Sequence, residues 1–288
     1  MKILITGANG QLGITLQDVL KDHQLILTDR EELDITNANA VNSFVGEKKP
    51  DVIINAAAYT AVDKAEEEID TATKINVDGA KNLAIAAKKI NALFLHISTD
   101  FVFDGEKKIP YIESDLPCPL SVYGQTKFDA EKAVEKINRQ YFILRTAWLY
   151  SPFGKNFVKT MIKLGQEKDE IKVVSDQIGC PTYAYDLADA IRKLIEKANS
   201  YQLTAKSYYG LYHFAGSGSC SWYEFASEII KLSGGKAKVL PITTAEFDAI
   251  APRPAYSVLD CSKIKSLGIK TIPWQESLKR CIDILKKN

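Results

Sequence analysis

The sequence predicts an α/β fold, with a doubly wound parallel sheet and a smaller C-terminal α/β region. In the first half of the chain, short β-branched and apolar runs alternate with longer amphipathic stretches, which is typical of β-α-β units. A glycine-rich turn joins the first run to the first amphipathic stretch. After about residue 150 the alternation is less regular, so we expect residues 1–150 and 151–288 to form two unequal regions.

The individual elements follow from the spacing of apolar residues. Strands are expected at 2–6, 25–29, 51–57, 92–99 and 141–148, and later at 171–175, 211–215 and 238–242. Helices are expected at 11–21, 71–89, 156–167, 183–197, 222–232 and 276–287, and from near Ser121. Ser221 stands three residues before Glu224, a spacing that predicts a capping box at the start of the helix at 222–232. Right-handed crossovers would place helices on both faces of the sheet, and we expect some later chain to cross back to it.

Composition narrows the class of protein. The chain has 37 basic and 36 acidic side chains, a balance that argues against binding nucleic acid through its phosphates. Its five cysteines are scattered without a C-x-x-C pair, which predicts neither a disulfide framework nor a zinc site. The first apolar run is too short for a signal peptide or a membrane span, so we expect a soluble, cytoplasmic protein without a membrane partner.

Three glycines follow the first strand and open the first helix, which is the context a G-x-x-G-x-x-G pattern requires. Gly7 permits the tight turn, Gly10 lets a pyrophosphate approach the backbone, and Gly13 lets the helix lie close to the strand. Gln11 and Leu12 lie within the same turn and join the expected cofactor contacts. Residues 1–150 are therefore expected to form a Rossmann-type dinucleotide-binding domain, and residues 151–288 mainly a substrate-binding region.

An acidic residue ends the second strand, where a carboxylate can bind the adenosine ribose hydroxyls. This residue is Asp29, and Arg30 follows it. The aspartate favours NADH, whereas the guanidinium could hold the 2′-phosphate of NADPH, so the choice between NADH and NADPH stays open. A charged pair that merely ends a strand is the alternative. Asp34 is included in the same expected contact set.

A run of mostly small residues follows the third strand, where the chain would pass over the cofactor's ribose. Its members are Ala57, Ala58, Tyr59 and Thr60. Small side chains there permit close approach of a ligand. Tight packing beneath a helix is an equal alternative explanation for them.

Tyr123 and Lys127 stand four residues apart on the face of a helix that continues through Ala130 and Val134. Burying a lysine on an apolar stripe costs folding free energy, so such a lysine is expected only where its charge has a role. Gly124 is a poor helix former and would fit a ligand lying against that turn.

This pair suits the reduction of a carbonyl, because hydride delivery leaves negative charge on an oxygen that then needs a proton donor. A phenol titrates near pH 10, and an ammonium about 4 Å away is worth roughly 4 kcal/mol, or about three pKa units. We therefore expect Lys127 to bring the pKa of Tyr123 near neutrality and to bind the nicotinamide ribose. Thr99 ends the fourth strand and can donate to the same oxygen. Asn76 is a candidate for a water or backbone link behind the lysine, or is a surface amide.

Several segments together resemble the dTDP-4-dehydrorhamnose reductase family of the extended short-chain dehydrogenase/reductase superfamily. They are residues 57–66, 98–105, 145–150, 176–182, 253–254 and 257–260. The resemblance implies reduction of the 4-keto group of dTDP-4-dehydro-L-rhamnose to dTDP-L-rhamnose with NADH or NADPH. It also implies a dTDP-sugar as partner, a possible homodimer and a possible response to Mg²⁺, for which the sequence shows no ligand spacing.

The resemblance assigns roles to single residues. Tyr123 would donate the proton with Lys127 beside it, and Thr99 and Asp100 would contact the sugar. The resemblance also implies that Trp148 would line the sugar site; the alternative is a buried core aromatic. Arg253 would contact the diphosphate, unless it is a solvated loop arginine.

One departure from the family pattern bears on the reaction. Phe101 stands where the family commonly has tyrosine, and where related dehydratases have a glutamate that acts as a base. A phenyl ring cannot remove a proton, so elimination is disfavoured. The alternatives left open are a sugar-nucleotide epimerase or other reductase, and a regulatory protein like the beta subunit of methionine adenosyltransferase.

Overall fold

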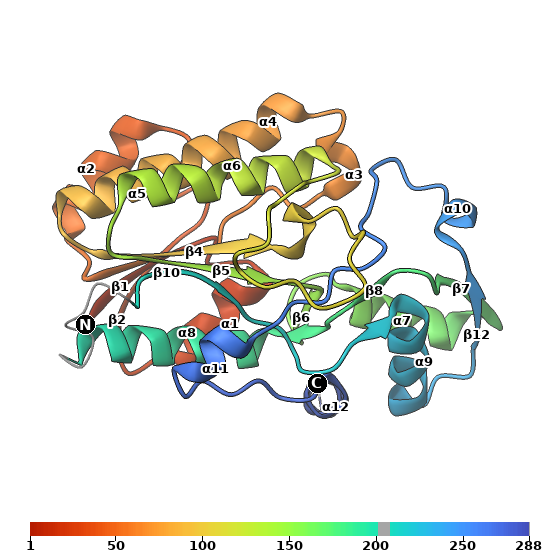
Figure 1. The fold of residues 1–288 in the computed structure, drawn as a ribbon. Coiled ribbons are helices and arrows are strands. Elements are labelled where there is room, and N and C mark those ends of the chain that lie inside the picture. The colour runs from red at the N-terminus through yellow and green to blue at the C-terminus, as the bar shows by residue number, and fades with distance from the viewer. Residues whose placement is uncertain (201–207, 288) are drawn as a thin grey trace.

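The computed structural model describes residues 1–200 and 208–287, and its centre is a six-stranded parallel sheet (Figure 1). The strands are β1 (Lys2–Thr6), β2 (Gln24–Thr28), β3 (Val52–Asn55), β4 (Leu93–Thr99), β5 (Tyr141–Thr146) and β10 (Gly210–His213). Their order is β10-β5-β4-β3-β1-β2, and every neighbouring pair is parallel. The chain reverses its direction of winding between β1 and β3, which confirms the doubly wound α/β fold.

Helices cover both faces of this sheet (Figure 1). On one face lie α2 (Ala38–Lys48), α5 (Ala80–Lys89) and α6 (Val122–Ile137), over an apolar cluster that includes Leu4, Ile53 and Phe94. On the other lie α1 (Gln11–Val19), α8 (Ala184–Asn199) and α11 (Ser262–Ser266). α1 packs against α8, so a helix from beyond residue 150 completes this layer.

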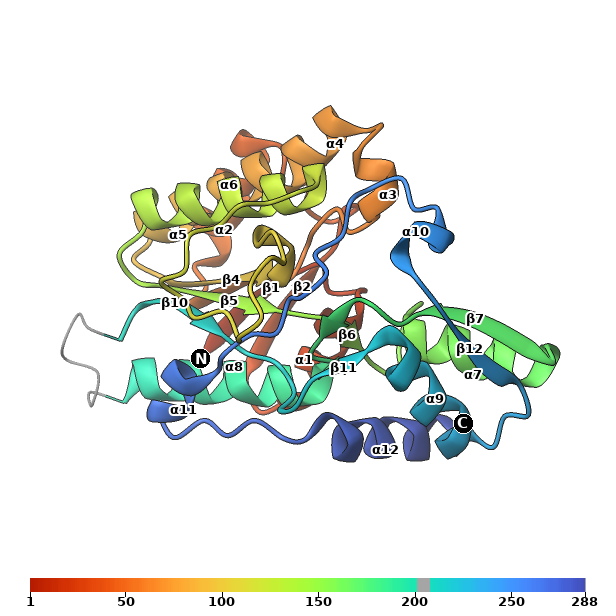
Figure 2. The same cartoon turned by 45° about the vertical axis from the view of Figure 1, so that its right-hand side comes forward.

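A smaller α/β unit lies beside the sheet (Figure 2). β7 (Glu170–Val174) pairs in parallel with β12 (Lys238–Ile242), and α7 (Phe157–Glu167), α9 (Trp222–Ser233) and α12 (Trp274–Leu285) pack around a core centred on Phe225. The capping box that begins α9 is confirmed, because Ser221 accepts from the backbone of Glu224 and the Glu224 carboxylate accepts in return. In the part of the chain that the structure describes, no helix is long and apolar enough to cross a membrane.

Among the longer helical segments, two differ from the expectation. The stretch expected as one helix at 71–89 is interrupted: α4 (Ile69–Thr73) leads into a π-helical turn at Lys74–Gly79 before α5. The turn carries the buried Asn76, whose amide bonds the backbone of Tyr59. α2 was not expected, because its apolar spacing is weak, and its start depends on Asn37, whose side chain caps two backbone N–H groups.

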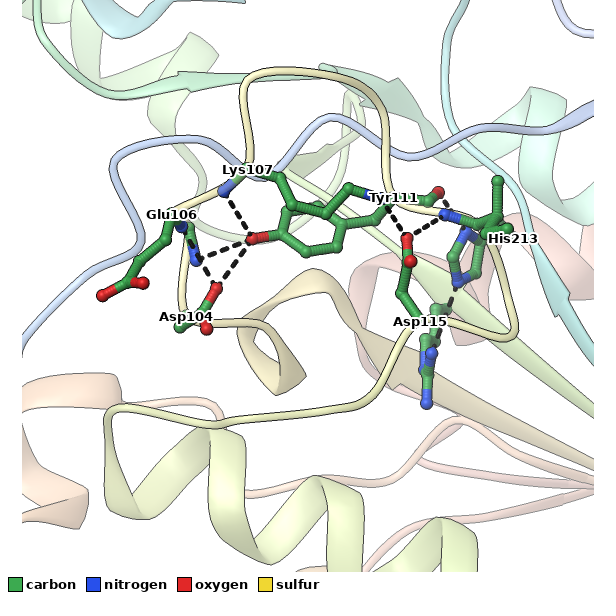
Figure 3. A network of polar contacts seen from close by, with 9 residues as sticks. Asp104, Glu106, Lys107, Tyr111, Asp115 and His213 are labelled. Carbon is green, nitrogen blue, oxygen red and sulfur yellow. Dashed lines mark hydrogen bonds and ion pairs between the residues drawn. The ribbon is translucent and has the colours of Figure 1, made fainter.

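The connection from β4 to α6 runs through a 3₁₀ turn at Asp100–Val102 and a long loop (Figure 3). Tyr111 fastens this loop, since its hydroxyl donates to Asp104 at 2.8 Å and accepts from the backbone of Gly105 at 3.1 Å. The Tyr111 carbonyl in turn lies 3.1 Å from Nδ1 of His213 on β10. The loop between β4 and α6 is therefore bonded to β10, the edge strand of the sheet.

A buried ion pair joins α6 to the sheet. Arg145 of β5 contacts both carboxylate oxygens of Glu131, at 2.8 and 2.6 Å, and the two side chains are 3% and 4% exposed. Ser98 of β4 donates to the same carboxylate at 2.5 Å. Neither charge meets solvent, so each depends on the other for its stabilisation.

We expect Glu131→Ala to lower the free energy of unfolding by about 3–5 kcal/mol, because it leaves the buried Arg145 charge without a partner. Urea denaturation followed by circular dichroism measures this. Lys163→Ala, which removes an ion pair whose side chains are 72% and 55% exposed, is the control and should cost less than about 1 kcal/mol. Equal effects of the two substitutions would contradict this interpretation of the buried pair.

Candidate active site

Two adjoining cavities lie at the carboxyl ends of the parallel strands. The first, the turn cavity, has about 530 Å³ and is lined by the glycine turn and by residues after β2 and β3. The second, the reaction cleft, has about 700 Å³ and extends from the same glycine turn to Thr99, Tyr123 and Lys127. Gly10 lines both, so one continuous hollow runs along the edge of the sheet where ligands of such folds bind.

The glycine turn brings α1 close to the strands. Gly7 has φ +69°, and a Cβ there would lie 2.7 Å from the backbone nitrogen of Ala57. A Cβ on Gly13 would overlap the carbonyl of Gly7. No side chain among the described residues caps the start of α1, which leaves its first N–H groups directed at the hollow. Leu12 lines the reaction cleft.

Gln11 also lines the reaction cleft and connects the two parts of the chain. Its side-chain oxygen accepts from Asn156 at 2.9 Å and from Ser151 at 3.2 Å. The start of α1 is thereby tied to the segment that precedes α7.

The three charged residues expected near the adenosine ribose all line the turn cavity. The Asp29 carboxylate accepts from the backbone of Asn9 at 3.1 Å and of Arg30 at 2.8 Å. Hydrogen bonds from Thr36 hold the pKa of Asp34 below its usual value. Lys74 lines the same cavity and was not expected there, because its position depends on the π-helical turn that the sequence pattern does not show.

The small residues after β3 are divided by the structure. Ala57 and Ala58 line the turn cavity, and Thr60 lines the reaction cleft. Tyr59 lines neither, because its hydroxyl donates to Glu68 at 3.0 Å. Its backbone is held by Asn76, whose amide also donates to the Thr126 hydroxyl of α6 at 3.0 Å. Asn76 therefore supports the catalytic helix through Thr126 and is not a surface amide.

α6 begins directly after Ser121, whose hydroxyl caps Gly124, and it directs Lys127 at the sheet. Lys127 is 2% exposed, and its Nζ donates to the carbonyl of Ile97 at 2.6 Å and lies 3.5 Å from Nε2 of His96. Burial lowers the pKa of this ammonium to about 8, and the charge of Glu131 one turn later opposes that fall.

The expected lowering of the Tyr123 pKa is wrong for this structure. Burial raises the pKa of the phenol to about 12; the charge of Asp100 acts in the same direction and the Thr99 hydroxyl opposes it. Spacing places Tyr123 and Lys127 on one helix face, but Nζ is occupied by the Ile97 carbonyl. Sharing a face did not give the close phenol–ammonium contact on which the expectation depended.

Thr99 and Asp100 form the floor of the reaction cleft. The Thr99 hydroxyl donates to Oδ1 of Asp100 at 3.1 Å, and Oδ2, although buried, makes no hydrogen bond of ordinary length among the described residues, with Ser257 near enough to oppose the rise of the carboxyl pKa. Burial raises the pKa of this carboxyl to about 6. A buried oxygen without a partner at a cleft wall is suited to accept a hydrogen bond from a ligand hydroxyl.

The structure gives Gly124 a steric reason that the sequence did not show. A Cβ at this position would collide with the carbonyl of Phe101, so the glycine permits two backbone segments to touch. The Phe101 ring in turn meets the edge of the Tyr123 ring, with centroids 5.6 Å apart. Both rings line the reaction cleft, so this contact helps to fix the phenol ring at the cleft wall.

A third, more apolar cavity of about 330 Å³ opens from the far end of the reaction cleft. Trp148 and Arg253 line both spaces, as does Trp222, which was not expected. The two indoles are stacked with centroids 3.5 Å apart, and only the fold brings the start of α9 to Trp148. Arg253 is an anchored side chain, because it pairs with Asp63 at 2.8 Å and donates to a nearby carbonyl.

The described residues give no support for the magnesium that the resemblance implied. No group of three or more histidine, cysteine, aspartate or glutamate side chains gathers there in a way that could hold a metal ion.

Comparisons with known proteins identify relatives of the whole chain. A family model described as the RmlD substrate binding domain matches residues 1–287. A dTDP-4-dehydrorhamnose reductase from Aggregatibacter actinomycetemcomitans is 44% identical over 288 residues, covering 96% of this chain and 97% of that protein. A solved dTDP-4-dehydrorhamnose reductase from Clostridium acetobutylicum is 52% identical with a TM-score of 0.94, over 99% of this chain and 100% of the other.

A second solved structure shows a cofactor in a relative. It is the dTDP-4-dehydrorhamnose reductase of Bacillus anthracis in complex with NADP, which is 44% identical with a TM-score of 0.93, over 98% of this chain and 99% of the other. Sequence and fold agree over nearly the full length. The chain therefore belongs to the dTDP-4-dehydrorhamnose reductase family.

Proposed function

We propose that the protein reduces the 4-keto group of dTDP-4-dehydro-L-rhamnose to dTDP-L-rhamnose with NADH or NADPH. The observation that carries the proposal is the meeting of Thr99, Tyr123 and Lys127 in one cleft that joins the glycine turn to an apolar cavity. The names of relatives that align over nearly the whole chain support the same reaction. The intact set of three catalytic groups favours an enzyme over a regulatory protein.

The residues present fit a nicotinamide dinucleotide. Gly7, Gly10 and the uncapped start of α1 would receive the pyrophosphate, and Asp29 with Arg30 would receive the adenosine ribose. Lys127 would use its remaining N–H for the nicotinamide ribose. The bound cofactor supplies the hydride, which arrives at the carbonyl carbon of the substrate.

The catalytic side chains handle the charge that appears on the substrate oxygen. Tyr123 donates its phenolic proton to that oxygen, and the Thr99 hydroxyl, whose single proton goes to Oδ1 of Asp100 in the structure, would turn to donate a hydrogen bond to it. Lys127, whose Nζ is bonded to the Ile97 carbonyl, would hold the nicotinamide ribose and does not contact the phenol. Asp100 accepts from a neighbouring sugar hydroxyl through Oδ2.

The remaining parts of the substrate lie toward the C-terminal region. We assign the diphosphate to Arg253, whose guanidinium lies at the junction of the reaction cleft and the apolar cavity. The thymine base would occupy the apolar cavity beyond the stacked Trp148 and Trp222. The homodimer and the cytoplasmic location stay predictions, and no step of the proposed reaction uses magnesium.

Asp29 and Arg30 leave the choice between NADH and NADPH open. Both cofactors would bind, and NADPH would gain an added contact to its 2′-phosphate. Arg30 and Lys74 line the same turn cavity as Asp29, so two cations are available to a 2′-phosphate. The relative that holds NADP supports this assignment.

Replacing Tyr123 by phenylalanine should lower kcat by about 10²–10⁴-fold, because the ring stays in place without its proton. The assay mixes purified protein with dTDP-4-dehydrorhamnose and follows the loss of reduced nicotinamide absorbance. Tyr185→Phe, which removes a hydroxyl bonded to Asp18 outside the cleft, is the control and should leave turnover unchanged. Wild-type turnover no greater than that of Tyr123→Phe would refute the proposed reduction.

Arg30→Ala should lower kcat/KM with NADPH by roughly 10- to 100-fold, since it removes a charge-assisted contact to the 2′-phosphate. With NADH the value should change little. Lys81→Ala removes an exposed cation that does not line the turn cavity, and both cofactors should be used as by the wild type. The assignment fails when Arg30→Ala weakens the two cofactors equally.

The pH dependence should follow Lys127. Its pKa is about 8, so the ammonium is present below that pH and is lost as the pH rises through it. We expect kcat/KM to fall above about pH 8, while Tyr123, with a pKa of about 12, keeps its proton. Profiles of kcat/KM on both sides of pH 8 measure this. Lys127→Arg, which stays charged, should lose the alkaline fall; an unchanged profile would assign the fall to another group.

A further inference from the structure

A line of buried polar side chains crosses the sheet beneath α6. Thr6 stands opposite Asn55, and Asn55 stands opposite His96, on the adjacent strands β1, β3 and β4. Residues in register on parallel strands point to the same face, so the three side chains form a row. The Thr6 hydroxyl donates to Oδ1 of Asn55 at 2.9 Å, and Nδ2 of Asn55 lies 3.1 Å from Nδ1 of His96. At most 1% of any of them is exposed.

The row ends at the catalytic lysine, because Nε2 of His96 lies 3.5 Å from Nζ of Lys127. An ammonium has three N–H donors and no acceptor. One donor of Lys127 goes to the Ile97 carbonyl. The His96 nitrogen is the second neighbour of Nζ, so a charged lysine requires Nε2 to be an acceptor with a free lone pair.

This requirement fixes the rest of the row. A neutral imidazole has one N–H and one lone pair, so a lone pair on Nε2 places the hydrogen on Nδ1. The Asn55 amide must then be turned by about 180° from its orientation in the structure, so that Oδ1 faces Nδ1 of His96 and the NH₂ group faces the Thr6 hydroxyl. The two ends of an amide have nearly the same shape, and the hydrogen-bond network decides which end faces which neighbour.

We propose that His96 is a positioning residue for Lys127, and that Thr6 and Asn55 hold it as the neutral tautomer with hydrogen on Nδ1. Two of the three N–H groups of Lys127 are then anchored, to Ile97 and His96, and the third is directed into the reaction cleft. Burial and the ammonium both hold the pKa of His96 well below its usual value, which agrees with a neutral ring. The role of Lys127 itself rests on the proposed function.

The alternative is that His96 merely fills space in the sheet. An apolar residue would serve that purpose without burying unpaired nitrogen atoms, and Phe94 does so two residues earlier on the same face. Three consecutive positions on three strands are polar and mutually bonded instead.

Two amide substitutions separate the two ends of the ring. His96→Gln can place an amide oxygen where Nε2 stands, so it can still accept from Lys127. His96→Asn keeps a polar atom near Nδ1 and cannot reach the lysine. His96→Leu removes both contacts. We expect Asn and Leu to lower kcat/KM for NADPH by about 10- to 100-fold, with the glutamine variant about tenfold better than asparagine.

The affinity for NADPH, measured by fluorescence titration without substrate, should follow the same order, since Lys127 is expected to hold the nicotinamide ribose. Thermal denaturation checks that the Gln and Asn variants are comparably folded. Equal activity and affinity of these two variants, or a better asparagine variant, would overturn the positioning role.

The tautomer is tested without any activity. The chain has three histidines, and ¹⁵N chemical shifts of the His96 ring at neutral pH distinguish a protonated Nδ1 from a protonated Nε2. We expect hydrogen on Nδ1 and a lone pair on Nε2; the opposite tautomer, or a doubly protonated ring, would overturn the proposal. A wild-type protein that fails to reduce the sugar nucleotide would refute the proposed function alone, because the shifts and NADPH affinity are read independently.

Discussion

The site depends on how α6 is held against β4. Lys127 and Glu131 stand one turn apart on α6, carry opposite charges and are both buried. Their partners are successive residues of β4, the Ile97 carbonyl and the Ser98 hydroxyl, and Glu131 is fixed further by Arg145 of β5. Because a buried charge is costly without its partners, the helix cannot rotate or slide without breaking several contacts together. The position of Tyr123 follows from this constraint, since it lies one turn before the lysine.

The second constraint is that all six strands of the sheet run in the same direction. Their carboxyl ends meet at one edge, so the glycine turn after β1, the alanines after β3 and Thr99 at the end of β4 share one hollow. The long loop after β4 must return the chain to the start of α6 without covering this edge. The Tyr111 hydroxyl and its carbonyl contact with His213 hold the loop to the side, which leaves the cleft open to a sugar nucleotide.

Periodicity and turn chemistry were sufficient to predict the strands of the main sheet, the glycine turn and the stripe of Tyr123 and Lys127. These features are local, because each is encoded within one turn or one strand. The residues that the sequence pattern missed are set by tertiary contacts. Trp222 reaches Trp148 only once α9 is packed, and Lys74 reaches the turn cavity only through the π-helical turn. The pKa predicted for Tyr123 was wrong for the same reason. Spacing along a helix does not show which acceptor a flexible ammonium binds, and Lys127 binds the Ile97 carbonyl.

A raised pKa of Tyr123 suits the proposed direction of reaction. Reduction consumes a proton at the substrate oxygen, so the competent form of Tyr123 is the neutral phenol. A phenol whose pKa was lowered to about 7 would be ionised in about half of the molecules near pH 7. The resulting phenolate would repel the developing oxyanion. With a pKa of about 12 the proton is retained until hydride transfer makes that oxygen strongly basic. Lys127 then contributes by holding the nicotinamide ribose, since its Nζ is bonded to the Ile97 carbonyl and makes no close contact with the phenol.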